Sequence, residues 1–164
     1  MEKKYELVKD NVKISIINGR VLILYRIRAL KDFCDIKKGD LGGYVESEEN
    51  LGQEGNCWIY DDAKVYGYAK VSDSAIIYGN AKVYDKAEVY GNASVSGNAI
   101  IADNAIICEH AKVYDDAKIY GNTIVCGNAR VYGNAIVCGN ARVCGNARVC
   151  DNAIVCGNAK VCGN

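Results

Sequence analysis

The stretch NARVCGNARVCDNAIVCGNAKVCGN, from Asn140 to Asn164, repeats a six-residue unit four times with almost no change. The same unit extends back to Asn56, so that eighteen consecutive hexapeptides end at Gly163 without an insertion or deletion. Self-similarity at a fixed short period is the signature of a repeat architecture. The chain also has no proline and only one Phe, one Trp and one Met, which argues against a globular core of mixed large side chains.

Each hexapeptide predicts one short strand followed by one turn. The order Ala, x, Val, Tyr/Cys alternates with a period of two, so Ala and Val face one way and their neighbours face the other. Gly or Asp followed by Asn then predicts a bend, because these residues tolerate positive φ. A bend every six residues predicts triangular coils of eighteen residues, about six in all, stacked as three parallel sheets with strands roughly 4.8 Å apart. Asparagine ladders are expected along the corners, as for Asn104, Asn122, Asn140 and Asn158.

The first 55 residues lack the repeat, so we expect an N-terminal unit of residues 1–55 and a β-helix of residues 56–164. Asn18-Gly19 lies between two apolar-rich runs in VKISIINGRVLILYRIRAL, which predicts a β-hairpin. The following DIKKGDLGGYVESEENLGQEG predicts an irregular entry segment, which with the hairpin would cap the N-terminal edge of the solenoid. At the other end the repeats stop bluntly, and we expect another copy to cover the strand edges there.

Two motifs resemble a known family. The pattern V-x-G-N-A-x resembles the hexapeptide signature of left-handed parallel β-helices, and the segment RIRALKDFCDIKKGDLGGYVESEENLGQEGNCWIYDDA, Arg26–Ala63, resembles the opening of YdcK-like β-helix proteins, including many short phage and prophage proteins. With the repeats, this resemblance covers about residues 20–164. It implies a left-handed coil and a phage or prophage type of protein. Members of this family are also named acetyltransferases, mainly because of their fold. A fold alone does not establish an activity.

Charge and cysteine content narrow the classes of function. Twenty basic residues balance twenty acidic ones, so a general attraction to nucleic acid or to a membrane surface is not expected. The densest apolar run, Val21–Tyr25, is too short to span a membrane, so we expect a cytoplasmic protein, in the host cytoplasm if it is phage-encoded. Its nine cysteines are then expected to be thiols, since parallel Cβ vectors make ladder disulfides strained. Without a CxxC or Cys–His pattern, no metal site is predicted.

An acyltransferase is the enzymatic alternative. The resemblance to hexapeptide-repeat proteins implies a histidine general base with acyl-CoA laid along the prism, and the one histidine here is His110. It occupies the corner position that Asn fills in neighbouring units, and no second catalytic group accompanies it. We therefore expect no catalytic residue and no cofactor. His110 and acetyl-CoA would matter only if the protein is an acyl/acetyl-CoA transferase.

One column of outward-facing cations and tyrosines is a candidate ligand-binding site. Lys112, Arg130 and Arg148 follow one another once per coil, flanked by Tyr114 and Tyr132. Cations beside aromatic rings can hold phosphates or stack a base, although such a column is also typical of an ordinary solvated surface. A small phosphorylated ligand is thus the expected partner at this column.

The C-terminal half also carries apolar outward residues, and contiguous apolar surface usually marks an interface. The candidate interface residues are Ile106, Ile124, Ile136, Ile154, Cys126, Cys138, Cys144, Cys156 and Cys162. We therefore predict a non-catalytic binding module of phage or prophage type that self-associates through its C-terminal coils. It would bind a host protein or a small anionic ligand, in a counter-defence or ligand-sequestering role. A purely structural, self-assembling solenoid remains the other alternative.

Overall fold

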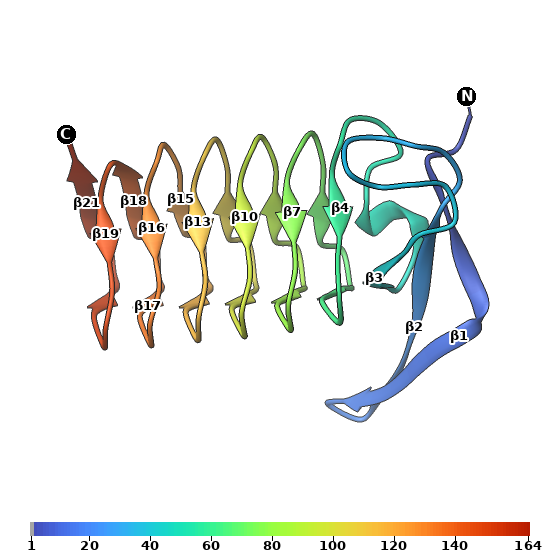
Figure 1. The fold of residues 1–164 in the computed structure, drawn as a ribbon. Helices are drawn as coiled ribbons and strands as arrows, with labels where there is room; N and C mark the ends of the chain where they lie inside the picture. Colours follow the sequence, from blue (N-terminus) through green and yellow to red (C-terminus); the bar gives the residue numbers. More distant parts are fainter. Residues whose placement is uncertain (1) are drawn as a thin grey trace.

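A computed structural model describes residues 2–164 and shows an all-β protein with a strand hairpin at one end of a parallel β-solenoid (Figure 1). Strand β1 (Tyr5–Ile17) pairs antiparallel with β2 (Arg20–Ala29) across the Asn18-Gly19 turn, where both residues have positive φ. The predicted hairpin is confirmed. Helical structure within residues 2–164 is limited to one 3-10 turn, η1 (Glu48–Asn50), so none of these residues forms a helix able to cross a membrane.

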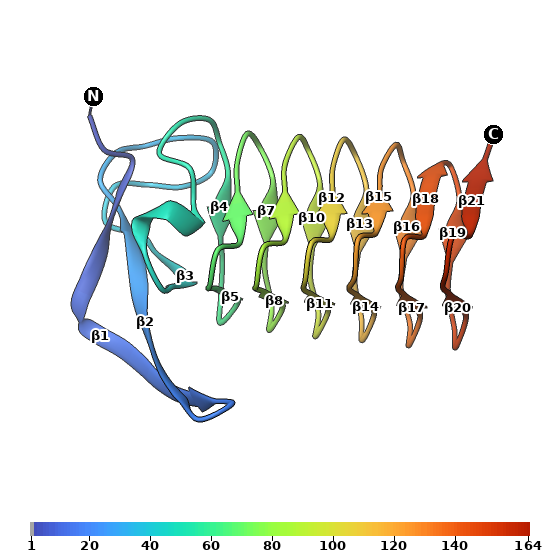
Figure 2. The same ribbon diagram turned by 180° about the vertical axis from the view of Figure 1, so that it is seen from behind.

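The short strands form three sheets, one along each side of the coil (Figure 2). The first sheet continues from β1 and β2 through β3 (Leu41–Val45), β5 (Lys64–Val65), β8 (Lys82–Val83), β11 (Ile100–Ile101), β14 (Lys118–Ile119), β17 (Ile136–Val137) and β20 (Ile154–Val155). The second, called here the β4–β19 sheet, holds β4 (Trp58–Ile59), β7 (Ile76–Ile77), β10 (Ser94–Val95), β13 (Lys112–Val113), β16 (Arg130–Val131) and β19 (Arg148–Val149). The third, the β6–β21 sheet, holds β6 (Lys70–Val71), β9 (Glu88–Val89), β12 (Ile106–Ile107), β15 (Ile124–Val125), β18 (Arg142–Gly145) and β21 (Lys160–Gly163).

From β4 onward, neighbouring strands within each sheet pair in parallel at a spacing of eighteen residues, as Val113 does with Val131. The predicted triangular coil is therefore confirmed. Parallel pairing begins before the hexapeptides, because Tyr44 of β3 lies opposite Lys64 of β5 and Leu51 forms a bridge with Val71. With this first partial coil the solenoid has about seven turns.

The interior of the prism is built from the two alternating inward positions of each unit. Ala111 and Val113 are completely buried, as are their equivalents in most other coils. Thr123 occupies one of the Ala positions, and its buried hydroxyl oxygen has no hydrogen-bond partner. The prediction that the Ala and Val positions face the same way is confirmed, and they face the core. Thr123 shows that the Ala position also admits a hydroxyl and a methyl group.

The N-terminal segment covers the open edge of the first coil. The Trp58 ring contacts Phe33 and Tyr5 edge-on, with ring centroids 5.3 and 6.3 Å away. The buried ammonium of Lys4 donates to the carbonyl oxygen of Cys57, 2.9 Å away, and to two further carbonyls before it. Burial lowers the pKa of Lys4, with the nearby Cys57 opposing that shift. The buried ammonium of Lys4 is thus partnered by the chain itself.

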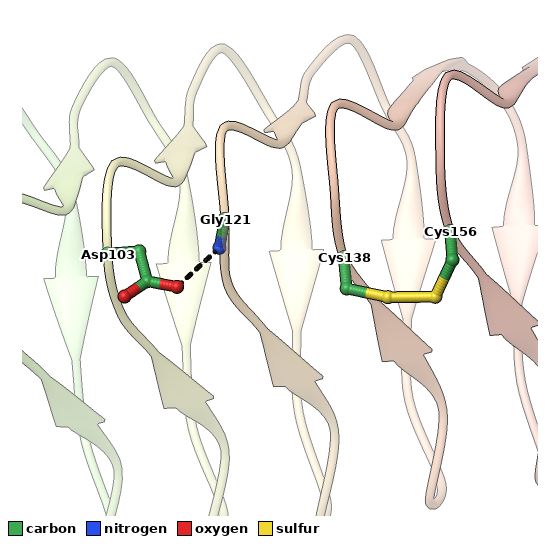
Figure 3. Close-up of a disulfide and its surroundings, with 4 residues drawn as sticks. All are labelled: Asp103, Gly121, Cys138 and Cys156. Carbon is green, nitrogen blue, oxygen red and sulfur yellow. Dashed lines mark hydrogen bonds between the residues drawn. A yellow bond between two sulfur atoms is a disulfide. The ribbon is translucent and has the colours of Figure 1, made fainter.

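The corners carry two kinds of ladder. Asn104 donates from its side-chain amide to Asn122 over 3.0 Å, and Asn122 donates in turn to Asn140 over 3.1 Å, which confirms the predicted asparagine ladder. The preceding corner residue has positive φ, as Asp103 and Gly121 do at 57° and 80°. There the Asp103 carboxylate accepts a hydrogen bond from the Gly121 backbone N–H one coil further along (Figure 3).

Four cysteines form two disulfides between adjacent coils, Cys138–Cys156 (Figure 3) and Cys144–Cys162. The expectation that all nine cysteines are thiols is therefore wrong for these four. In-register stacking places the paired Cα atoms 4.6 and 4.7 Å apart, inside the range of about 4.4 to 6.8 Å that disulfides span. The roughly 4.8 Å spacing of the strands was expected, and the parallel Cβ vectors were weighed against it; in the structure the short separation decides the outcome. The cysteines that remain free are Cys34, Cys57, Cys108, Cys126 and Cys150.

Candidate ligand-binding site

The structure brings the predicted cations and tyrosines together on the β4–β19 sheet. Lys112 lies beside Arg130 on neighbouring strands, and Arg130 lies beside Arg148, so the three exposed side chains form one column. The rings of Tyr114 and Tyr132 stack next to this column, with centroids 4.9 Å apart and planes parallel. We call Lys112, Arg130 and Arg148 the basic column.

The basic column has no carboxylate partner among residues 2–164. All six salt bridges of this part of the chain join residues numbered between 3 and 62. The nearby carboxylate of Asp115 instead accepts a hydrogen bond from the backbone N–H of Gly133, 3.1 Å away. Like charges on adjacent strands repel each other, so an anion bound across them gains charge-assisted hydrogen bonds and relieves that repulsion.

A depression of about 360 Å³ opens beside two of these cations. Its floor is formed by Ser94 and Ser96, the two outward residues of one hexapeptide, NASVSG. The units one coil before and one coil after it on the same sheet carry the large outward pairs Ile76 with Tyr78 and Lys112 with Tyr114, so the depression exists because two side chains are small. The residues that line it are Tyr78, Ser94, Ser96, Gly97, Lys112, Tyr114, Asp115 and Arg130.

Sequence reasoning found part of this site and missed part of it. Lys112, Tyr114 and Arg130 line the depression, whereas Tyr132 and Arg148 lie further along the same sheet. The roles of the serines and of Tyr78 were not predicted. A usable signal was present, because NASVSG is the one unit of the eighteen with serine at both outward positions.

The depression has features of a small-ligand site. Its volume lies within the range of about 300 to 1,000 Å³ that such sites occupy. Ser96 is only 7% exposed, and its hydroxyl makes no hydrogen bond to any other residue within 2–164. The buried side-chain atoms without a partner in this part of the chain are Arg26 Nε and Thr123 Oγ1, so the Ser96 hydroxyl reaches the surface of the depression and is available to a ligand.

Two other depressions lack this combination. One of about 430 Å³ on the first sheet is lined by Lys82, Ile100, Lys118 and Ile136 together with corner residues, without an aromatic ring. Another, of about 380 Å³, lies between the hairpin turn and the stacked Tyr66 and Tyr84. Its cation, Arg20, is already paired with Glu46 at 2.5 Å.

His110 lies apart from these depressions. It is exposed at the corner between β12 and β13, in the position that the repeat usually gives to Asn. Its side chain makes no hydrogen bond to another residue of the described chain. Across residues 2–164, no three or more His, Cys, Asp or Glu side chains gather in a metal-binding arrangement.

The candidate interface residues lie on the other two sheets. Ile106 pairs with Ile124 on the β6–β21 sheet, and Ile136 pairs with Ile154 on the first sheet. The cysteines beside them are Cys138 and Cys156, joined by one disulfide, and Cys144 and Cys162, joined by the other, while Cys126 is free. These stripes face away from the basic column, so ligand binding and association would use different faces. The interface itself stays a prediction.

Comparisons with known proteins agree with the fold. Residues 125–139 and 141–157 match a family described as the YdcK β-solenoid repeat. Over 52 residues the chain is 46% identical to a protein of Escherichia coli (strain K12) named "Uncharacterized acetyltransferase YdcK". The matched segment covers 31% of this chain and 16% of that relative. The resemblance inferred from the sequence motifs is thus confirmed for the solenoid. The word acetyltransferase in the relative's name describes that protein only.

Proposed function

We propose that this protein, a β-solenoid of the YdcK type, is a non-catalytic binding module that captures a small anionic ligand on its β4–β19 sheet. One observation carries the proposal: Lys112 and Arg130 line the same depression, and neither has a carboxylate partner within residues 2–164. Cations in such a position attract anions, and a phosphate ester is the anion class that offers several acceptor oxygens to both of them.

The two cations offer complementary contacts. The guanidinium of Arg130 presents a planar fork that matches two phosphate oxygens, and the ammonium of Lys112 adds a compact point charge on the adjacent strand. The roughly 4.8 Å between neighbouring strands allows one phosphate group to contact both. The backbone is held by hydrogen bonds to the coils on either side, so binding orders little of the chain and keeps that entropic cost low.

The proposed role in self-association rests on the outward-facing isoleucines. Ile154 is 66% exposed and lies next to Ile136, and such apolar surface favours association with a second copy or with a host protein. In the cytoplasm of a phage host, a self-associated solenoid with one such depression per chain would sequester its ligand. The resemblance to phage and prophage proteins supports a counter-defence role of this kind.

Binding of phosphate tests the proposal directly. Isothermal titration of the purified protein with inorganic phosphate and with pyrophosphate should give saturable binding, weakening as salt is added. Arg130→Glu should weaken it about tenfold or more, because the charge is reversed at the site. Arg142→Glu is the matched control, since Arg142 occupies the same repeat position on the β6–β21 sheet. Absence of binding by the unaltered protein, or equal binding by Arg130→Glu, would overturn the proposal.

Acyl transfer is the second candidate, favoured by the name of the Escherichia coli relative. In that case His110 would act as the general base toward acetyl-CoA. His110→Asn restores the usual corner residue of the repeat, so it should leave the fold intact. We expect that the unaltered protein neither binds nor hydrolyses acetyl-CoA. A transfer activity that disappears in His110→Asn would replace the binding module with an enzyme.

A further inference from the structure

The tyrosine column of the β4–β19 sheet has a gap one coil wide. Tyr78, Ser96 and Tyr114 occupy the same outward position in three successive coils, because Val95 pairs with Ile77 on one side and with Val113 on the other. Serine thus replaces the ring in the middle coil. Both flanking tyrosines line the depression, and Tyr78 is 39% exposed.

The solenoid itself shows how rings stack at this position. Tyr114 and Tyr132, one coil apart, lie parallel with centroids 4.9 Å apart, and Tyr66 and Tyr84 on the first sheet lie within 3° of parallel at 5.0 Å. Two coils separate Tyr78 from Tyr114, which is roughly 9.6 Å at the usual strand spacing. A flat ring placed between them would lie one coil spacing from each, as neighbouring tyrosines do elsewhere in this protein.

We propose that the ligand carries a flat heteroaromatic ring that fills the gap over Ser96, with its phosphate on Lys112 and Arg130. A nucleoside monophosphate is the chemical class that combines these two groups, and this assignment rests on the proposed anion-binding function. Stacking between aromatic side chains is how proteins hold bases without reading their sequence. The polar floor favours a base over a hydrocarbon ring, because the Ser96 hydroxyl lies at the surface of the depression without a hydrogen-bond partner in the described chain, and a ring that covers it must replace the water it would otherwise bind.

The neighbouring first sheet provides a natural comparison. Ala102 interrupts its tyrosines in the same way, between Tyr84 and Tyr120, which occupy the same repeat position one coil before and after. The outward partner in that unit is the large Ile100, whereas the partner of Ser96 is the small Ser94. The depression on the first sheet is lined by lysines and isoleucines but by neither tyrosine, whereas both flanking tyrosines line the one over Ser94 and Ser96. The gap alone is therefore not the site.

Titration with inorganic phosphate, ribose 5-phosphate and adenosine monophosphate tests the assignment. Adenosine monophosphate should bind about tenfold or more tightly than inorganic phosphate, because stacking on a base adds affinity that phosphate alone lacks. Ser96→Tyr fills the gap with the side chain usual at this position. The affinity for adenosine monophosphate should then fall to the affinity for inorganic phosphate. Ala102→Tyr, the matched control on the first sheet, should leave binding of adenosine monophosphate unchanged.

A second variant keeps the test informative if Ser96→Tyr perturbs the coil. Tyr78→Ser removes an exposed ring from one wall, so it should weaken binding of adenosine monophosphate more than binding of inorganic phosphate. If phosphate binds and adenosine monophosphate binds no more tightly, the ring assignment is wrong and the anion-binding function stands. If neither binds, the proposed function fails. If both variants bind adenosine monophosphate like the unaltered protein, the base does not occupy the gap and the inference is overturned.

Discussion

The Asp103 carboxylate accepts a hydrogen bond from the backbone N–H of Gly121, 2.8 Å away in the next coil (Figure 3). Other acidic residues at corner positions make the same contact eighteen residues on, namely Asp61 with Gly79, Asp73 with Gly91, Glu109 with Gly127 and Asp115 with Gly133. An acidic residue in place of the corner glycine therefore adds a bond between coils that glycine cannot make. The sequence interpretation assigned to Asp only its tolerance of positive φ.

Two substitutions of Asp103 separate the contribution of its side-chain hydrogen bond from that of its backbone conformation. Asp103→Gly keeps the left-handed backbone conformation and loses the side-chain acceptor, so we expect a loss of about 1 kcal/mol in the free energy of unfolding. Asp103→Ala loses the acceptor and also places a Cβ-bearing residue without a polar side chain at positive φ, which costs about 1 to 2 kcal/mol more. Urea unfolding followed by circular dichroism measures both. Glu88→Ala is the control, because Glu88 is exposed, lacks positive φ and makes no side-chain hydrogen bond within residues 2–164. Equal stability of the Ala and Gly variants would contradict the backbone argument.

The repeat made most of the fold predictable. Because Ala and Val alternate within each unit and Gly or Asp precedes Asn at each bend, the inward positions, the corners and the coil length all follow from local rules. The Asn18-Gly19 hairpin is equally local. Each of these features depends on residues close together in the sequence or on a strict period.

Features that depend on long-range contacts were not predictable in this way. Lys4 reaches the carbonyls of residues 54, 55 and 57 through an irregular segment that has no period. The depression arises where side chains are small, and its value as a site depends on Lys112 and Arg130 lacking a partner anywhere in the described chain. Such properties are settled only when all surrounding residues are placed.

The disulfides provide a second test of stability. Cys138 and Cys156 close a loop of eighteen residues, and a cross-link of about this length stabilises a protein by about 3 kcal/mol through the unfolded state. Changing both to serine should lower the free energy of unfolding by about that amount, and reduction of the unaltered protein should act in the same direction. Cys126→Ser is the control, because Cys126 is free and half-buried at the same repeat position. Peptide mass spectrometry that finds free thiols at Cys138 and Cys156 after non-reducing purification would contradict the pairing.

Alkaline pH should destabilise the protein through the half-buried Tyr60 and Tyr66. Burial raises the pKa of Tyr66 to about 12, with the adjacent Tyr84 adding to the shift, and burial together with the hydrogen bond to Asp35 raises the pKa of Tyr60 to about 12. In the unfolded chain these phenols ionise near pH 10, so between about pH 10 and 12 the folded state holds more protons than the unfolded state. The contribution of these phenols to the free energy of unfolding is therefore fully present below about pH 10 and is lost as the pH rises through 12.

Lys4 acts in the opposite direction, because burial lowers its pKa and the unfolded chain then holds the extra proton up to about pH 10.5. Above that pH its contribution no longer changes, so the decline caused by Tyr60 and Tyr66 should dominate. Urea unfolding in a pH series, with tyrosinate absorbance recorded on the folded protein, measures both effects. Tyr66→Phe removes one of the shifted groups, so its stability should fall less steeply above pH 10 than that of the unaltered protein. Tyr68→Phe is the control, because Tyr68 is exposed. In this variant the stability should fall with pH as steeply as in the unaltered protein. A free energy of unfolding that stays level between about pH 10 and 12 would show that the half-buried phenols do not govern alkaline stability.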